Sequence, residues 1–216
     1  PVPSWTLGSV DAAISDVPLV LRNAVAFDGP PAFAGWGVGG FLSPQHLHET
    51  AFIVIDLSHD SLVAVEGDAA AVSAWLTSRY PDLRPLEVKR EPGELVVIEA
   101  SVAGSQPIRA QINTGTDLTE VSPHAAGGLR GTAPLEIGYG VSGTEVEGEH
   151  ATGQTLRVSD WEWPVPRVLT REQPPCDDGA PPLQAQVGMD LLRATVLAVS
   201  ADRSLPVLWL VPPGEA

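Results

Sequence analysis

Three consecutive residues, Asn113, Thr114 and Gly115, place a side-chain amide, a hydroxyl and a glycine directly after a run of strand-forming residues. Gly115 supplies the backbone freedom of a tight turn and lets another segment come close. The Thr114 hydroxyl can hydrogen-bond locally and fix the turn. The carboxamide of Asn113 donates and accepts hydrogen bonds, but it cannot ionise or share a proton. Taken alone, these three residues predict only a turn.

Two stretches rich in β-branched residues lead into this turn. Residues 95–103 and 106–112 predict two strands joined at Gly104 and Ser105, and the second strand ends at Ile112. After the turn comes Thr119-Glu120-Val121-Ser122-Pro123. The sequence therefore predicts that a strand pair presents the polar turn at its end.

The segment from Leu95 to Pro123 resembles the active-site segment of the retropepsin and pepsin-like aspartic proteases. That family has Asp-Thr-Gly or Asp-Ser-Gly at the turn, followed by a residue or two and a Thr or Ser. Here Asn113 stands where the family has its catalytic Asp. The stretch Val187–Leu192 is similar to the family's second signature, a glycine between apolar residues that opens a short helix near the active site. Residues 139–148 lie where the family has its flap.

The resemblance implies an all-β, acid-protease-like fold of two β-barrel lobes with one interlobe helix. It also implies an endopeptidase that hydrolyses peptide bonds with a water activated by an Asp dyad. Such a dyad holds one proton: its ionised member deprotonates the water and its protonated member polarises the scissile carbonyl. No cofactor and no metal are implied.

The same resemblance assigns the site residues. Asn113, in place of Asp, would form the catalytic turn with Thr114 and Gly115. The flap residues Tyr139, Gly140 and Val141 would bind a peptide or protein substrate, which lies extended like an added strand.

Asn113 leaves two interpretations open, because this lobe cannot supply its half of an acid dyad. The chain is an inactivated Asp-to-Asn form of a protease, or it is a pseudoprotease that acts as a peptide-binding or structural β-module. We favour the first, since Asn is the closest isostere of Asp and the rest of the turn is intact.

Composition limits the function classes. A net charge of −15 argues against a nucleic-acid partner, whose phosphates require Lys and Arg. The 21 Gly and 21 Pro favour many turns and little helix. A single cysteine, Cys176, excludes an internal disulfide. No apolar run approaches the length of a membrane span, and the compartment stays open between exported or periplasmic and cytoplasmic.

The chain divides at one predicted helix. We expect the rear half of a first lobe at 1–67, a helix and linker at 68–93, and a complete second lobe at 94–216. The helix runs from Ala69 to Tyr80, is capped by Asp68 and stopped by Pro81. Its predicted buried face consists of Val72, Trp75, Leu76 and Tyr80. A β-hairpin is expected at 52–65.

An internal repeat relates the two parts. Thr6-Leu7 matches Thr155-Leu156, 17–21 matches 165–169, 28–29 matches 178–179, and 37–42 matches 188–192; a terminal hairpin follows each copy. We therefore expect segments 5–66 and 154–211 to be related by a pseudo-twofold axis. The first copy lacks a counterpart of 95–153, and we expect an amino-terminal fragment of the same precursor, or a second copy of the chain, to supply it.

Other residues have chemical potential but weaker patterns. His46 and His48 near Glu49 could bind a metal, and so could Glu147, Glu149 and His150. A surface loop explains the first group, and the charged tip of the flap explains the second. Cys176 lies beside Asp177 and Asp178, and neighbouring carboxylates disfavour its thiolate.

Overall fold

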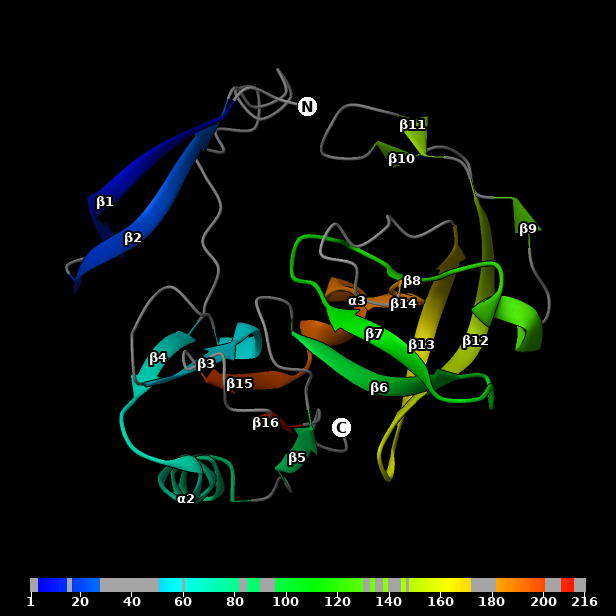
Figure 1. Cartoon of the computed structure of the whole chain (residues 1–216). Coiled ribbons are helices and arrows are strands. Elements are labelled where there is room, and N and C mark those ends of the chain that lie inside the picture. Colours follow the sequence, from blue (N-terminus) through cyan, green and yellow to red (C-terminus); the bar gives the residue numbers. More distant parts are fainter. Residues whose placement is uncertain are drawn as a thin grey trace.

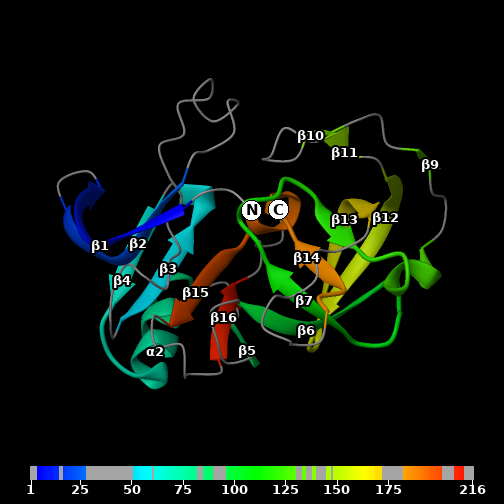
Figure 2. The same cartoon turned by 45° about the horizontal axis from the view of Figure 1, so that its top comes forward.

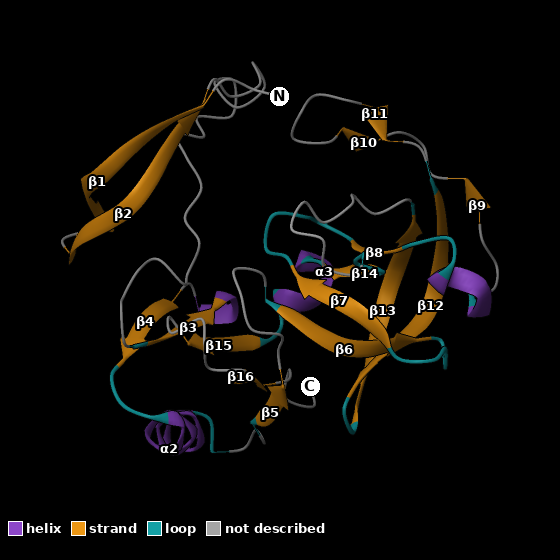
Figure 3. Ribbon diagram, viewed as in Figure 1, coloured by secondary structure: helices purple, strands orange, loops and turns teal. Residues whose placement is uncertain are grey.

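The computed structural model describes residues 4–14, 17–27, 51–59, 61–81, 85–89, 96–129, 133–134, 138–139, 145–146, 148–171, 182–200 and 207–211. Within these residues the chain is mainly β, which confirms the all-β part of the predicted fold class and the low helix content expected from its glycine and proline residues (Figure 3). No helix in these ranges is long and apolar enough to cross a membrane.

The strands belong to two large sheets and two separate hairpins. The hairpins are β1 (Ser4–Ile14) with β2 (Val17–Phe27), and β10 (Gly138–Tyr139) with β11 (Glu145–Val146). The five-stranded sheet contains β3 (Phe52–Asp56), β4 (Ser61–Val65), β5 (Leu86–Lys89), β15 (Val196–Ser200) and β16 (Val207–Val211). The seven-stranded sheet contains β6 (Val97–Val102), β7 (Ile108–Ile112), β8 (Thr119–Val121), β9 (Ala133–Pro134), β12 (Glu149–Val158), β13 (Trp161–Thr170) and β14 (Ala185–Val187).

The helical elements are short. They are α2 (Ala69–Arg79), α3 (Met189–Leu192) and the 3-10 turns η2 (Leu57–His59) and η3 (Ala125–Gly128). The predicted hairpin at 52–65 is present as β3 and β4, and the strands predicted before the polar turn are present as β6 and β7.

The seven-stranded sheet curls into a nearly closed ring (Figure 1). Its order is β13-β8-β14-β7-β6-β12-β9, and β12 pairs with both β6 and β13. The third strand in this order, β14, lies parallel to β7 and antiparallel to β8. A strand from late in the chain therefore separates β7 from β8, and the connection between these two strands must cross the end of β14.

The five-stranded sheet has the order β4-β3-β15-β16-β5, and its central strands β3 and β15 are buried on both faces. Phe52 and Val54 of β3 pack with Val72 and Leu76 of α2 on one face. Residues of the same sheet that point the other way join the core of the ring, as Ile53 and Ile55 do. The continuous apolar run of β3 follows from this double burial.

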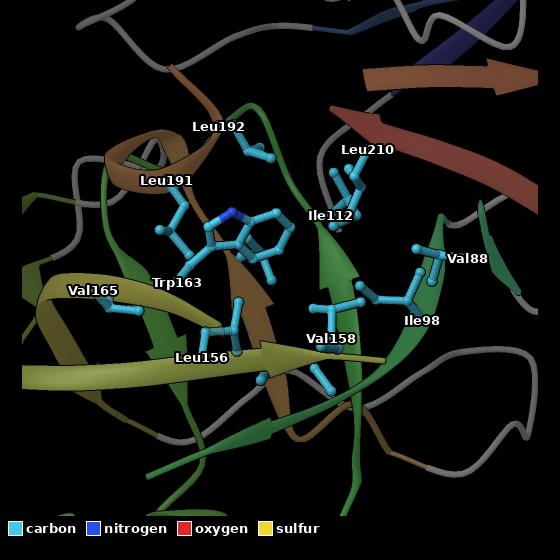
Figure 4. Close-up of a cluster of buried hydrophobic side chains, with 14 of the residues drawn as sticks. Val88, Ile98, Ile112, Leu156, Val158, Trp163, Val165, Leu191, Leu192 and Leu210 are labelled. Carbon is cyan, nitrogen blue, oxygen red and sulfur yellow. The ribbon is translucent and has the colours of Figure 1, made fainter. Parts of the chain in front are cut away.

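A single core connects the two large sheets, which lie side by side in Figures 1 and 2. Figure 4 shows this core, where Trp163 lies near Leu191, and Ile112 lies near Leu210 of the neighbouring sheet. Because Ile112 immediately precedes Asn113, the core fixes the end of the strand that carries the polar turn.

The predicted helix is confirmed as α2. The Asp68 side chain accepts a hydrogen bond from the backbone N–H of Ala71 at 3.0 Å, as an N-cap does. Val72 and Leu76 are fully buried, whereas Trp75 and Tyr80 are only partly buried at the edge of the cluster.

The prediction of a linker at 82–93 is wrong in its centre. Residues 86–89 form β5, which pairs antiparallel with β16 at the edge of the five-stranded sheet. Val88 is buried, while Glu87 and Lys89 are exposed. The strand is short, charged and preceded by Pro85, so its pairing with β16, more than its own pattern, makes it a strand. The five-stranded sheet thus takes strands from all three predicted segments.

Three pairs of elements recur at one constant separation in the sequence. Counted from their turns, β1 and β2 correspond to β12 and β13, with Ile14 paired to Val17 and Val158 paired to Trp161, 144 positions later. Strands β3 and β15 are also 144 positions apart. Two hairpins of similar length are therefore each followed, after an equal stretch of chain, by an equivalent strand.

The two equivalent strands β3 and β15 are direct neighbours. They pair antiparallel, and their central residues, Val54 and Ala198, face each other. An antiparallel pair matched at its centre has a local twofold axis between the strands, so the repeat has this symmetry where its two copies meet.

The residue matching predicted for the repeat is wrong in register. It pairs 17–21 with 165–169 and Thr6 with Thr155, which differ by four and five positions from the matching set by the hairpin turns. A strand repeats every two residues, so the shift of four positions keeps the same apolar alternation and cannot be detected from that alternation. The shift of five positions at Thr6 does not keep the alternation. The matches at 28–29, 178–179 and 37–42 fall outside the described ranges.

A buried carboxylate, Asp56 at the end of β3, ties α2 to the β3–β4 hairpin. Its two oxygens accept hydrogen bonds from Ser58 Oγ at 2.6 Å, the backbone N–H of His59 at 3.2 Å, His59 Nδ1 at 2.8 Å and Tyr80 Oη at 2.7 Å. Burial raises the pKa of Asp56, but these hydrogen bonds and the His59 charge outweigh burial and lower it. Burial and the Asp56 charge raise the pKa of Tyr80 to about 12.

We predict that Asp56→Ala lowers the free energy of unfolding by about 2–3 kcal/mol at pH 7, because four donors lose a charged acceptor. The lowered pKa means that this contribution is present above the unfolded pKa of about 3.9 and is lost as the pH falls through the folded value. Urea unfolding at pH 7 and pH 3 should therefore show a smaller difference at pH 3. Asp160→Ala, in the exposed turn after β12, is the control; equal effects of both variants would contradict the assignment.

Candidate functional site

The polar turn begins where β7 ends, and the side chain of Asn113 organises it. The Asn113 side-chain oxygen accepts a hydrogen bond from the backbone N–H of Gly115 at 2.8 Å. The backbone N–H of Asn113 donates to the carbonyl of Val187 at 3.0 Å. Thr114 and Gly115 are exposed, and Asn113 is half-buried. The turn is thus closed by its own side chain and attached to β14.

The loop from Asn113 to Leu118 crosses the junction between β14 and α3. The backbone N–H groups of Met189 and Asp190 donate to the carbonyls of Thr116 and Asp117 at 2.8 and 2.9 Å. These N–H groups belong to the first turn of α3 and have no partner within the helix. The predicted similarity at 187–192 correctly placed a glycine and a short helix next to the turn.

Gly188 is required by this crossing. A Cβ at this position would lie 2.4 Å from the carbonyl oxygen of Leu118 and 3.0 Å from the backbone nitrogen of Thr119. Both are backbone atoms, which cannot move aside as a flexible side chain can. The φ of Gly188 is −98°, so the requirement is for space and not for an unusual backbone conformation.

Thr119 joins the loop to the helix through its hydroxyl. The hydroxyl donates to Asp190 Oδ1 at 2.8 Å and accepts from the backbone N–H of Gly188 at 3.2 Å. Thr119 is fully buried. A hydroxyl that both donates and accepts therefore holds the start of β8 against the start of α3.

A buried glutamine, which the sequence analysis did not identify, contacts the candidate catalytic position. The Oε1 atom of Gln186, at the centre of β14, accepts a hydrogen bond from Asn113 Nδ2. Gln186 pairs in register with Gln111 of β7 and Glu120 of β8. Registered residues of neighbouring strands point to the same face of a sheet, so these side chains form one polar row.

Glu120 extends this polar row with a buried charge. Its Oε2 lies 3.0 Å from Arg171 Nε, and its Oε1 accepts from Thr116 Oγ1 at 3.3 Å. Glu120 is 5% exposed, so the ion pair with Arg171 balances a charge that would be costly alone. Thr116 belongs to the polar turn, and the turn is therefore linked to this ion pair as well.

A short hairpin lies in the segment that was predicted to be the flap. Residues 138–139 and 145–146 form the two-stranded hairpin β10–β11, in which Tyr139 pairs with Glu145. In both views this hairpin lies above the loop that joins β7 to β8 (Figures 1 and 2). Gly140 and Val141, the other two predicted substrate-binding residues, lie outside the described residues.

The candidate metal ligands do not assemble in the described ranges. No group of three or more His, Cys, Asp or Glu side chains there is arranged to hold a metal ion. Glu149 and His150 lie on β12, while His46, His48, Glu49, Glu147 and Cys176 fall outside the description.

Comparison with known proteins adds no assignment. No protein-family model matches the sequence, and no curated protein is significantly similar to it. The chemistry of the site is therefore argued from the contacts of the turn, β14 and α3.

We predict that Gly188→Ala lowers the free energy of unfolding by about 1–3 kcal/mol, since the added methyl group forces the loop away from α3. Chemical denaturation measures this loss. Gly127→Ala is the control, because a Cβ at Gly127 meets nothing within 4 Å. A Gly188→Ala variant as stable as the control would show that the loop does not lie on this glycine.

We predict that Thr119→Val destabilises the protein by about 1–3 kcal/mol, because the buried N–H of Gly188 and the carboxylate of Asp190 each lose a partner. Thr119→Ser keeps the hydroxyl and should retain most of the stability. Thermal and urea unfolding of the two variants separate the hydroxyl from the methyl group. Greater stability of the valine variant would contradict the role of the hydroxyl.

Proposed function

We propose that this chain is an aspartic endopeptidase of the retropepsin and pepsin-like type in an inactivated form, with Asn113 in the place of the catalytic Asp. One observation carries the proposal: the side-chain oxygen of residue 113 accepts the backbone N–H of Gly115 at the end of a strand, directly over the β14–α3 junction. A carboxylate has the same shape and could accept the same hydrogen bond.

The surroundings of the turn support the proposal. Gly188 packs against the loop without a side chain, and Thr119 links the loop to Asp190 of α3. Residue 113 is therefore fixed at two points: its backbone N–H bonds the carbonyl of Val187, and its side-chain oxygen accepts from the N–H of Gly115. Rigid placement of a reacting group is what acid–base chemistry on a bound peptide requires.

The repeat supports a second, related lobe. The hairpin pairs and the strands β3 and β15 recur 144 positions apart, and β3 meets β15 about a local twofold axis. In a two-lobed acid-protease-like fold, an equivalent turn from the other lobe would face residue 113. That turn would supply the second acid, from an amino-terminal fragment of the precursor or from a second copy of the chain.

The proposed substrate is a peptide or protein segment in extended form. The hairpin β10–β11 lies on the side of the ring where the polar turn is, as a flap over an extended chain would (Figure 1). Backbone hydrogen bonds would hold such a segment, and side-chain pockets would select it.

A non-catalytic peptide-binding module is the second candidate, and the contact between Asn113 and Gln186 favours it. The NH₂ group of Asn113 donates to the amide oxygen of Gln186, so its hydrogen-bonding requirement is met. It needs no proton and no second acid, so the chain could bind a peptide without cleaving it.

We predict that Asn113→Asp, in the presence of a second lobe with its acid, creates peptide cleavage that statine-type transition-state analogues inhibit. The rate should fall as the pH rises and the shared proton of the acid pair is lost. A diverse peptide library, analysed by mass spectrometry across pH, measures the activity. The unchanged protein and Asn23→Asp, at the only other asparagine of the chain, are the controls.

The two candidates differ in the outcome of this experiment. If Asn113→Asp cleaves and the controls do not, the peptidase proposal is supported. If no variant cleaves, although a second lobe with its acid is present and the unchanged protein binds extended peptides, the binding module is supported and the peptidase proposal fails.

A further inference from the structure

The orientation of the Asn113 amide is determined by one backbone group. The N–H of Gly115 can only donate, so the atom of Asn113 that it contacts must be the side-chain oxygen. The NH₂ group of Asn113 therefore faces Gln186, and Gln186 must present its own oxygen. The N–H of Gly115 thus determines the orientation of the Asn113 amide, which in turn determines that of the Gln186 amide.

Gln186 is held next to residue 113, whose side-chain NH₂ donates to it. It is 6% exposed and lies between β7 and β8, with Gln111 and Glu120 as its registered partners. Buried side chains in a paired strand have few alternative rotamers. Gln186 is thus a buried polar group whose amide contacts the candidate catalytic position.

We propose that Gln186 is a positioning residue whose amide adapts to the chemical state of residue 113. It presents its oxygen to an amide at this position, and after a half-turn of the amide it presents its NH₂ group to a carboxylate. The inference rests on the proposed function, because only a peptidase needs a carboxylate there. It adds a role for a glutamine that the resemblance does not assign.

A carboxylate at residue 113 would then accept two hydrogen bonds, from Gly115 N–H and from the Gln186 NH₂. Donors that contact the charged form of an acid lower its pKa. Gln186 would thus make residue 113 the ionised member of an acid pair, which is the member that takes the proton from water. The acid of the other lobe would carry the shared proton.

Other charged groups near residue 113 are balanced in ion pairs or hydrogen-bonded. Glu120 of β8 is paired with Arg171, which follows β13. Asp117 of the loop lies 3.6 Å from Arg193, which follows α3, and Asp190 of α3 accepts from Thr119. None of these three contacts involves Gln186, so a comparison of variants tests the effect of its amide.

The test is an NMR titration, in the full chain, of the carboxyl carbon that Asn113→Asp introduces. This variant is compared with the double variant Asn113→Asp/Gln186→Met, since Met fills a similar volume and has no NH₂ group. We expect the acid dissociation constant of the new carboxyl group to fall about tenfold in the double variant, which is a rise in its pKa. Asn113→Asp/Gln111→Met is the matched control and should leave the titration unchanged. Equal pKa values with and without Gln186 would overturn the proposal.

A second measurement needs no change at residue 186. In Asn113→Asp, the side-chain nitrogen resonance of Gln186 should shift with the same midpoint as the new carboxyl group. A resonance that does not move while the carboxyl group titrates would overturn the proposal. Neither measurement uses cleavage. An Asn113→Asp variant that titrates as expected but cleaves no peptide, although a second lobe with its acid is present, therefore refutes the proposed function and leaves the contact of Gln186 with the carboxylate standing.

Discussion

The crossing of one loop over the β14–α3 junction is the constraint on which the site depends. Because β14 lies between β7 and β8, the connection from Asn113 to Leu118 must pass over the end of β14. The passage is possible only because Gly188 has no side chain there. Once the loop lies at this position, its carbonyls become the partners of the N–H groups that open α3. The strand order, the glycine at position 188 and the hydrogen bonds at the start of α3 thus depend on one another.

This arrangement explains why the site can be rigid although it lies in a loop. Ile112 before the turn is in the hydrophobic core, and so are Leu191 and Leu192 of α3 (Figure 4). The polar turn is thereby held between two pieces of core, and its hydrogen bonds to β14 and α3 fix the remaining freedom. An Asp at residue 113 would consequently take the same position as the Asn, and only the chemistry of the side chain would differ.

Local signals predicted the elements whose sequence alone determines their structure. Asp68 and the spacing of Val72 and Leu76 predicted α2, and the β-branched runs predicted β6 and β7. Strand β5 could not be predicted, because its residues become a strand by pairing with β16. Gln186 has no signal either, since a glutamine between two small or apolar residues has a role only when the fold places it opposite Asn113.

The pairing of β3 with β15 connects this local geometry to the larger symmetry. The strands β3 and β15, which are equivalent in the repeat, pair through their central residues. Each element next to β15 therefore has a symmetry-related position next to β3. In the second copy, α3 directly precedes β15, and the polar turn lies on α3. An equivalent turn near β3 would therefore lie across the local axis from Asn113. Under the proposed function, a twofold axis at this place would bring two equivalent turns together, which is the arrangement that a reaction with two carboxylates, one of them protonated, needs.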